Sequence, residues 1–372
     1  MKFPRIAIVY DRLNTYGGAE RVLQALHDEF PSAPLYASVC DRKKAKWLGD
    51  WKVYTTFLQG IPFAKNHHQW FGWVMPFAFE SLDLSAYDVI ISVTSEAAKG
   101  ILTLPHQKHI CYCLTPTRYL WSHTHEYEGT HFRWLKRFFF HSLRLWDFIA
   151  GQRPDQMIPI SYRVKARIEK YYRRDTAEVI YPPVALPEKT PKIIQPSEKD
   201  YFLVVSRLVP YKRVDLAIQA CIQLKQKVKI VGTGTDIARL KRMAQNSRYV
   251  EFLGFVSNDD LDTIYADAKA LICPQEEDFG IVSLEAQARN VPVLSYERSG
   301  VAETIEEGKT GVLFPKQTVE SLVEALVGFM PMHWKEEDFA QHVRGYSVDI
   351  FNKKFARVVQ SALENESVDR VM

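Results

Sequence analysis

Short apolar runs alternate with helical patterns along almost the whole chain. The run RIAIVYD (5–11) precedes the helical pattern AERVLQALHDEF (19–30), YDVIISVTS (87–95) precedes the pattern EAAKGILTL (96–104), and HICYCLT (109–115) follows as a further buried run. Continuous runs rich in β-branched residues and separated by helices are typical of a parallel sheet covered on both faces. The pattern therefore predicts an α/β fold, with helices over 19–30 and 96–104.

A segment rich in proline and lysine, VIYPPVALPEKTPKIIQPSEKD (179–200), interrupts this alternation, which then restarts with YFLVVS, KVKIVGTG, YVEFLGFV, ALICPQ and VPVLSY. We therefore predict two doubly wound, Rossmann-like domains over residues 1–180 and 181–348, and a C-terminal helix over 349–372 that packs back on the first domain. Ligands of such sheets bind beyond the carboxyl ends of the strands, so we expect the domains to face each other across a cleft that holds the site.

Composition narrows the class of protein. A chain of 372 residues, 47% of them hydrophobic, is long enough for two cores, and a net charge of +4 is too small for a dedicated nucleic-acid binder. No run of about 18 uncharged apolar residues predicts a membrane span. The five cysteines form no CxxC pair, which indicates buried thiols in a reducing compartment. The start MKFPRIAIVYD is interrupted too early for a signal peptide, so we expect a cytoplasmic protein.

Cations gather where the strand beginning at Tyr201 runs into an amphipathic helix near Val214, in the stretch SRLVPYKRVDLAIQ. The N-terminal end of a helix carries partial positive charge, so cations there are unfavourable unless an anion lies between them and the backbone N–H groups. A diphosphate is such an anion, and Arg207 and Lys212 are suited to hold it. The alternative is a solvated basic loop in which the proline only shapes the turn.

Two acids, Glu277 and Glu285, frame the stretch EEDFGIVSLE after the apolar run ALIC. Gly280 allows a close backbone approach, and we predict a helix over 281–288 whose first N–H groups lie near Gly280 and Ile281. Carboxylates only accept hydrogen bonds, so sugar and ribose hydroxyls are suitable partners. The alternative, a helix with acids near its start for reasons of helix dipole, explains Glu285 poorly because its neighbours are small and apolar.

The ordered set of motifs resembles family 4 of the glycosyltransferases, which are retaining enzymes of the GT-B fold. Glu277 to Glu285 resembles the donor-site signature of that family, SRLVPYK its phosphate-binding loop, and YGGAERVL (16–23) its N-terminal glycine loop. VGTG, FLGFVS and ETIEEGKTGVLF stand in the family's order. Within the family, MPFAFESLDLSAYDVIIS and CYCLTPTRYLW are most similar to O-antigen and exopolysaccharide mannosyltransferases.

The resemblance implies a hexosyltransferase that moves a sugar, best assigned as mannose from GDP-mannose, onto a growing and lipid-linked surface polysaccharide. The first domain would bind the acceptor and the second the nucleotide sugar. Arg207, Lys212 and Glu277 would be catalytic, with the two cations on the diphosphate and Glu277 on the donor sugar, while Glu285 would hold the ribose. The remaining donor-binding residues would be Gly17, Gly18, Gly232, Phe255, Val256, Phe279, Gly280 and Ile281.

Two positions depart from the family. Leu114 stands where related sequences carry a histidine beside the reacting centre, and leucine cannot accept a proton. Asn290 stands where glycine is common, and asparagine tolerates the left-handed conformation. The leucine leaves open a noncatalytic nucleotide-sugar-binding assembly protein. A second enzymatic alternative is a sugar-nucleotide epimerase or hydrolase on the same fold.

Neither a metal nor another cofactor is expected, since cations and helix N-termini can stabilise a leaving diphosphate. The acids of Asp260-Leu261-Asp262 open a predicted helix, and His123, His125 and the pair His67-His68 lack a set of partner ligands. The aromatic and basic segment 132–153 fits a peripheral contact with an anionic membrane, which would place the protein at the inner face of the cell membrane. The alternative for this segment is a core helix with solvated bases.

Overall fold

The chain divides into two compact units. This computed structural model describes residues 4–65, 67–122, 124, 133–187 and 192–369. Unit 1 comprises residues 1–183 and 349–372, and unit 2 comprises residues 184–348. The sequence placed the boundary after residue 180, within the same proline-rich segment.

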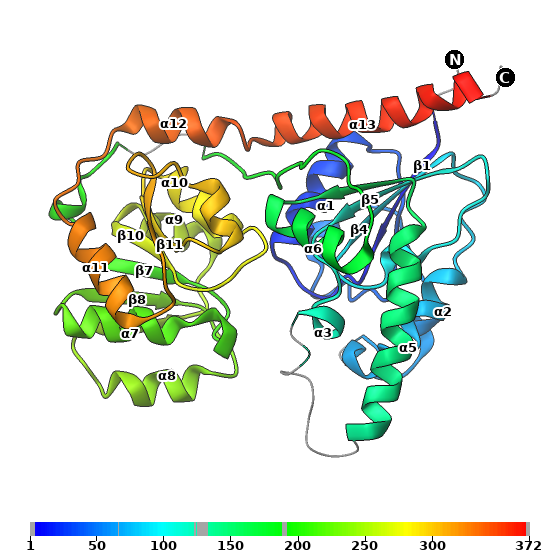
Figure 1. The fold of residues 1–372 in the computed structure, drawn as a ribbon. Helices are drawn as coiled ribbons and strands as arrows, with labels where there is room; N and C mark the ends of the chain where they lie inside the picture. Colours follow the sequence, from blue (N-terminus) through cyan, green and yellow to red (C-terminus); the bar gives the residue numbers. More distant parts are fainter. Residues whose placement is uncertain (1–3, 66, 123, 125–132, 188–191, 370–372) are drawn as a thin grey trace. The chain divides into compact units, whose positions relative to one another are not determined.

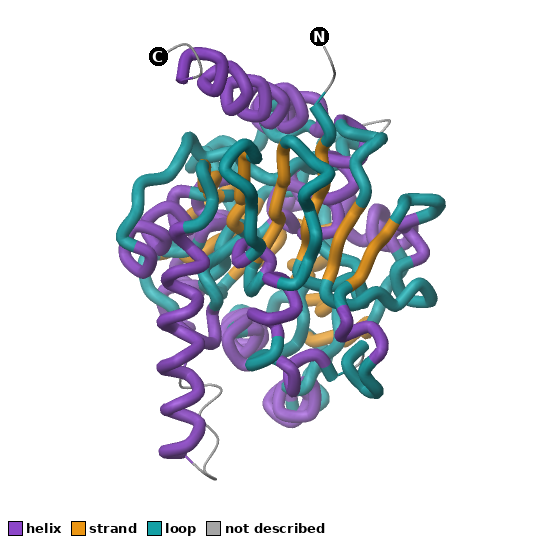
Figure 2. Tube along the Cα trace, turned by 90° about the vertical axis from the view of Figure 1, so that its right-hand side faces the viewer, coloured by secondary structure: helices purple, strands orange, loops and turns teal. Residues whose placement is uncertain are grey.

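Unit 1 is built on a six-stranded, all-parallel sheet with helices on both faces (Figures 1 and 2). The chain runs outward from the first strand, then returns to its other side, which is the doubly wound arrangement predicted from the apolar runs. The strand order is β3 (Val53–Thr55), β2 (Leu35–Ala37), β1 (Ile6–Tyr10), β4 (Val89–Thr94), β5 (Lys108–Cys113) and β6 (Gln156–Pro159).

The α-helices of this unit are α1 (Gly18–Glu29), α2 (Met75–Glu80), α3 (Arg118–Trp121), α5 (Arg133–Gln152), α6 (Tyr162–Tyr172) and α13 (Val348–Asp369). Short 3-10 helices, η1 (Lys46–Leu48), η2 (Phe57–Gly60), η3 (His68–Phe71) and η4 (Ala98–Gly100), join several of them to the strands. The ring centroids of Phe351 and Phe355 on α13 lie 5.7 and 5.8 Å from that of Tyr112 on β5, so the C-terminal helix packs on the sheet of unit 1.

The helix predicted over residues 96–104 is wrong. Only η4 forms there, because the carboxylate of Asp11 takes up the backbone N–H groups of residues 95–98 in a tight turn. Gly100, the last residue of η4, lies so close to the Trp146 ring that a side chain at this position would overlap it. The turn is therefore fixed by long-range contacts that the local pattern does not contain.

Unit 2 repeats the plan with a second six-stranded parallel sheet. Its strand order is β12 (Gly311–Phe314), β11 (Val293–Tyr296), β10 (Ala268–Cys273), β7 (Tyr201–Val205), β8 (Lys227–Val231) and β9 (Val250–Gly254). Successive residues of β7 enter different cores: Phe202 and Val204 join one, while Tyr201 and Leu203 join the other. Both faces of the sheet are therefore buried, as the continuous apolar runs predicted.

Helices cover both of these cores. They are α7 (Val214–Gln223), α8 (Ile237–Ala244), α9 (Asn258–Ala266), α10 (Ile281–Gln287), α11 (Val319–Phe329) and α12 (Glu336–Arg344), with 3-10 helices η5 (Pro196–Glu198), η6 (Pro210–Lys212) and η7 (Gly300–Thr304). Helix α7 forms because Val214, Ala217, Ile218 and Cys221 repeat at helical spacing, and all four are buried. Across the described part of the chain, no helix combines the length and the apolar character needed to cross a membrane.

Candidate functional site

The carboxyl edge of the unit 2 sheet is held together by loop-to-loop hydrogen bonds. The backbone N–H of Ser206 donates to Val231 at 3.1 Å, that of Leu208 donates to Thr233 at 2.9 Å, and that of Gly232 donates to Gly254 at 2.7 Å. A side chain at Gly232, whose φ is +127°, would overlap the carbonyl of Ser206. The close approach at this glycine is therefore made by the loop after β7.

That loop carries the two predicted cations in different environments. Lys212 ends η6 and is only 9% exposed, whereas Arg207 is exposed and donates through Nη2 to the hydroxyl of Tyr211 at 2.9 Å. The Lys212 Nζ also lies 5.3 Å from the centroid of the Tyr211 ring. The predicted helix start near Val214 is confirmed, and both cations lie before it. Arg213 adopts the left-handed conformation (φ 51°) between η6 and α7.

Lys212 and Glu277 form an ion pair between the loops that follow β7 and β10. Their side chains are 11% and 14% exposed. The Glu277 backbone is held from both sides: its N–H donates to Ser299 Oγ at 3.0 Å, and its carbonyl accepts from the N–H of Gly300 at 2.8 Å. Gln275 adds a weak contact from Nε2 to Glu277 Oε1 at 3.5 Å. The pair is thus presented on a rigid frame.

Glu285 points inward from α10 and is 7% exposed. Its Oε2 accepts from the Tyr265 hydroxyl at 3.1 Å, and its carbonyl accepts from Arg289 Nη1 at 2.8 Å. The Arg289 guanidinium reaches Asp262 Oδ1 at 2.5 Å and lies 5.5 Å from the centre of the Tyr265 ring. Glu285 is therefore a buried, hydrogen-bonded side chain and not a solvated surface glutamate.

The start of α10 depends on Gly280, which has a φ of +84° and caps the helix. A Cβ at this residue would overlap the side chain of Val301, which is fully buried in η7. Phe279 is buried with its ring centroid 6.4 Å from that of Tyr346, and Ile281 is partly buried. The loop therefore approaches η7 without space for a side chain at residue 280.

Other predicted donor residues lie on the same unit or on unit 1. Phe255 is 85% exposed, directly after β9, and Val256 packs partly against the core beneath it. Gly17 precedes α1 in an extended conformation, and Gly18 is the first residue of that helix. A Cβ at Gly17 would meet only Glu20 Oε2, at an ordinary 3.5 Å, so the packing of unit 1 does not itself require glycine there.

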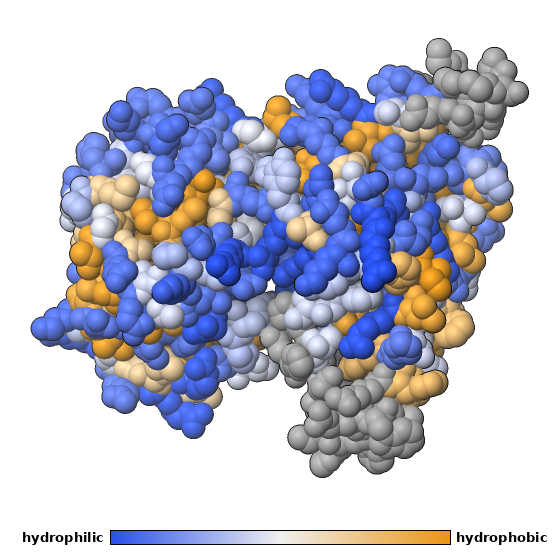
Figure 3. Space-filling view, in the orientation of Figure 1, coloured by the Kyte–Doolittle hydropathy of each residue, from blue (hydrophilic) through white to orange (hydrophobic). Residues whose placement is uncertain are grey.

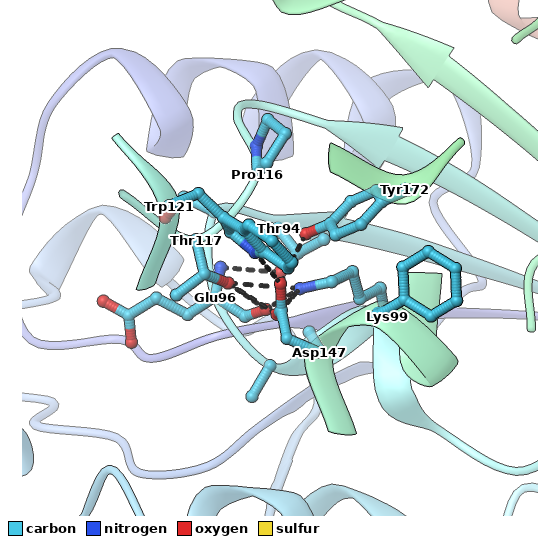
Figure 4. Close-up of polar contacts among 12 residues, drawn as sticks. Thr94, Glu96, Lys99, Pro116, Thr117, Trp121, Asp147 and Tyr172 are labelled. Atoms are coloured by element: carbon cyan, nitrogen blue, oxygen red, sulfur yellow. Dashed lines mark hydrogen bonds and ion pairs between the residues drawn. The ribbon is translucent and has the colours of Figure 1, made fainter. Parts of the chain in front are cut away.

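Sequence reasoning missed a buried polar network at the carboxyl edge of the unit 1 sheet, shown in Figure 4. Lys99 Nζ lies 2.6 Å from Asp147 Oδ1, and both side chains are 1% exposed. Asp147 also accepts from Thr117 Oγ1 at 2.7 Å, from Trp121 Nε1 at 2.7 Å and from the Tyr172 hydroxyl at 2.9 Å. The network ties η4, α3, α5 and α6 together around one carboxylate.

A second carboxylate, Asp11 after β1, is bound by the turn that follows β4. It accepts from Thr94 Oγ1 at 2.9 Å and from the four N–H groups of residues 95–98 at 2.7 to 3.0 Å. Leu114 follows β5 at the same edge, partly buried, with its N–H bonded to the Thr94 carbonyl at 2.8 Å. No sequence motif signals the contacts of Asp11, since they join residues more than 80 positions apart.

Candidate metal ligands are engaged in other roles or lie outside the described residues. Ser257 caps α9, with its Oγ 2.6 Å from Asp260 Oδ2, and Asp262 pairs with Arg289. His123 and His125 lie outside the described residues. Among the residues that the structure describes, no three His, Cys, Asp or Glu side chains gather as ligands for a metal ion.

The chain is similar to known sugar-transferring proteins. Residues 187–346 match the family model described as "Glycosyl transferases group 1". WcaL of Escherichia coli K12, named as a candidate glycosyltransferase of colanic acid biosynthesis, is 25% identical over 235 residues, which are 56% of this chain and 57% of that protein. A GDP-mannose-dependent α-(1-6)-phosphatidylinositol monomannoside mannosyltransferase of Mycobacterium tuberculosis is 30% identical over 145 residues, 35% and 38% of the two chains. The chain thus spans little more than half the length of these relatives, or less.

Among solved structures, Anabaena Alr3699/HepE in complex with UDP matches with a TM-score of 0.69 at 16% identity, over 96% of this chain and 100% of that one. At that identity the likeness shows the fold alone. It confirms the predicted GT-B fold of two doubly wound parallel-sheet domains.

Proposed function

We propose that the protein is a retaining hexosyltransferase, which the match of residues 187–346 to the model described as "Glycosyl transferases group 1" supports. It moves a sugar, best assigned as mannose from GDP-mannose, onto a growing, lipid-linked surface polysaccharide. The E. coli relative is named for colanic acid biosynthesis and the mycobacterial one for phosphatidylinositol monomannoside, which supports this class of product.

One observation carries the proposal: the Lys212–Glu277 pair lies where the strand order of the unit 2 sheet reverses. From β7 the chain proceeds to β8 and β9 on one side, then crosses to β10 on the other. Ligands of open α/β sheets bind outside the carboxyl ends of the strands at this switch point. A largely buried ion pair costs desolvation energy that a hydrophobic pair would not, so its place at this point favours a binding role.

The proposed chemistry uses the chain's own charges. Lys212, with Arg207 on the same loop, stabilises the negative charge that develops on the departing diphosphate, and Glu277 accepts hydrogen bonds from the donor sugar. Glu285 accepts from the ribose. We propose that no metal or other cofactor takes part. Because Leu114 cannot accept a proton, we assign that role to the donor phosphate, which then deprotonates the acceptor hydroxyl on the face from which the diphosphate leaves.

A comparison of nucleotide-sugar binding identifies the donor nucleotide. The mycobacterial relative is named for GDP-mannose, whereas the Anabaena structure holds UDP, so the panel includes GDP- and UDP-linked sugars. A ligand at 100 times its Kd raises the free energy of unfolding by about 2.7 kcal/mol, which a thermal-shift assay detects readily. We expect GDP-mannose to give the largest shift, and a panel without any shift would contradict the proposal.

Turnover tests the assigned residues. A charged hydrogen bond is worth about 1.5–3 kcal/mol, so Lys212→Met and Arg207→Gln each lower kcat/KM by about tenfold to a hundredfold. Lys227→Met, which removes only an exposed pair with Asp200, is the matched control and leaves turnover unchanged. Unchanged turnover in Lys212→Met would show that the pocket has been assigned wrongly.

Product analysis separates the alternatives. A glycosylated acceptor identifies a transferase, free sugar a hydrolase, and an epimerised nucleotide sugar an epimerase. Tight nucleotide-sugar binding without turnover on saccharide or lipid-linked acceptors identifies a noncatalytic assembly protein, the reading that Leu114 keeps open.

We also propose that the lipid-linked acceptor is met at the inner face of the membrane, with α5 in contact with lipid. Phe132, the first residue of the predicted contact segment, lies outside the described residues. Phe138, Phe139, Leu145 and Ile149 on α5 are between 47% and 65% exposed, which supports this contact.

A further inference from the structure

A second segment of unit 1, far from α5 in sequence, exposes large aromatic side chains. From η2 to α2, five aromatic side chains are at least half exposed. The exposed fractions are 50% for Phe57, 70% for Phe63, 63% for Trp70, 59% for Trp73 and 63% for Phe77. Tryptophan and phenylalanine usually bury much of their surface, because each ring removes a large apolar area from water. Five exposed rings within 57–77 therefore require an explanation.

The segment is rigidly attached, so the exposure does not come from an undocked loop. Leu58, Ala64, Met75 and Phe79 are at most 5% exposed and join one hydrophobic core of unit 1. These residues alternate with the exposed rings, which places the rings on the outer side of an anchored platform. Phe63 is held there with a φ of +67°, a conformation that is unfavourable for a bulky residue.

Helix α5 lies beside this platform. Trp146 packs against the same core and donates from Nε1 to Glu80 Oε1, at the end of α2, at 2.8 Å. Arg153 Nη2 lies 2.7 Å from the same oxygen. Figure 1 shows α2 alongside α5, and in Figure 3 apolar side chains gather around α2, beside α5. We call the exposed rings of 57–77, with the exposed apolar residues of α5, the aromatic face.

The acids next to the aromatic face are paired with bases. Glu80, at the end of α2, pairs with Arg153. The stretches 56–79 and 138–146 contain no Asp or Glu, and they contribute the bases Lys65 and Arg144. The first acid beyond them on α5, Asp147, is neutralised by Lys99 in the interior. Exposed phenylalanine and tryptophan side chains beside bases are characteristic of surfaces that insert shallowly among anionic headgroups.

We propose that the aromatic face docks this protein on an anionic lipid surface, and that the rings of 57–77 are its main anchor. The proposal extends the lipid contact of α5 to a platform that no helical pattern in the sequence predicted. It does not depend on glycosyl transfer, because vesicle binding is measured without a donor or an acceptor.

Vesicle co-sedimentation of the full chain tests the proposal, with phosphatidylcholine vesicles that contain or lack phosphatidylglycerol. We expect binding to the anionic vesicles and less to the neutral ones, and weaker binding to the anionic ones at about 1 M salt, where the Debye length is about 3 Å. Each ring that buries half of its exposed area contributes about tenfold to the partition, so Trp70→Ser with Trp73→Ser lowers it at least tenfold. Val327→Ser, which removes a side chain 56% exposed on α11, is the matched control and binds normally.

A conservative variant guards against loss of folding. Trp70→Phe with Trp73→Phe keeps vesicle binding, but quenching of tryptophan fluorescence by brominated lipid falls, because those two indoles are the ones that enter the bilayer. Unaltered vesicle binding in the double serine variant would overturn the proposal, as would quenching that is equal with and without the two tryptophans. The proposal also fails if vesicles do not bind and light scattering instead shows a dimer that the serine variant abolishes, since the face would then join two copies of the chain.

Discussion

Replacing Gly280 by alanine tests whether the loop between Glu277 and α10 is built as the structure shows. Two separate costs are expected. A φ of +84° is left-handed, which costs an L-residue about 1–2 kcal/mol. The new Cβ also overlaps Val301, a fully buried side chain that cannot swing aside, and overpacking of this kind costs about 1–3 kcal/mol more. The loss in the free energy of unfolding is therefore about 2–5 kcal/mol.

Gly308→Ala separates the two costs. Gly308 has a φ of +77°, close to that of Gly280, but no atom lies within 4 Å of its added Cβ. It should lose only the conformational part, about 1–2 kcal/mol. We would measure both variants by urea denaturation, with hydrogen exchange in β10 and β11 reporting the unfolding of unit 2. Equal losses in the two variants would refute the close packing of Gly280 on η7, and a stabilised Gly280→Ala would refute the left-handed cap as well.

Three further predictions concern buried groups. Lys99→Met leaves the buried Asp147 carboxylate without its cation, so urea denaturation should show a free energy of unfolding lower by about 3–5 kcal/mol. Adding Asp147→Leu should reduce this loss. A loss below about 1 kcal/mol in the single variant would contradict the prediction. Burial lowers the pKa of His109 to about 3. The free energy of unfolding therefore falls as pH drops below about 6.5, where the histidine of the unfolded chain takes a proton that the folded one does not. His109→Gln should remove about 2 kcal/mol of the loss between pH 7 and 5, and an unchanged pH profile would contradict this prediction. Burial raises the pKa of the Cys111 thiol to about 11 and those of the Cys221 and Cys273 thiols to about 12. Because the thiolate is the reactive form, iodoacetamide at about pH 8 should label none of the three in the native protein and all three in denaturant. Mass spectrometry of the labelled protein checks this, and labelling of the native protein would contradict it.

Much of the architecture could be predicted because it rests on local periodicity. The β-branched runs predict buried parallel strands, and the helical spacing of Val214, Ala217, Ile218 and Cys221 predicts α7. Separate motifs indicate Lys212 and Glu277 as candidate site residues, but their ion pair could not be predicted, because the two residues lie on different loops. The clamp that Ser299 and Gly300 place on Glu277 is also nonlocal, so no motif indicates it.

The same limit explains the errors. The 96–104 pattern is helical in sequence, but the Asp11 carboxylate captures its backbone N–H groups from another strand. The exposed aromatic residues of 57–77 are spread over η2, η3, α2 and the turns between them without a regular period, so their shared exposure is visible only in three dimensions. The facing of the two domains across a cleft, the roles of the donor-site residues and the independence from metal stay predictions.

The central claim is that Lys212 binds the diphosphate while Glu277 binds the sugar, and calorimetric titration tests it directly. Free nucleotide and the matching nucleotide sugar are titrated into the wild type, Lys212→Met and Glu277→Gln. Lys212→Met should weaken both ligands by about tenfold or more, since a charged contact is worth about 1.5–3 kcal/mol. Glu277→Gln should weaken only the nucleotide sugar, because the free nucleotide carries no sugar for Glu277 to bind. The substitution also releases Lys212 from its pair with Glu277, so the lysine stays available for the diphosphate. Equal affinities in all three proteins would contradict the account.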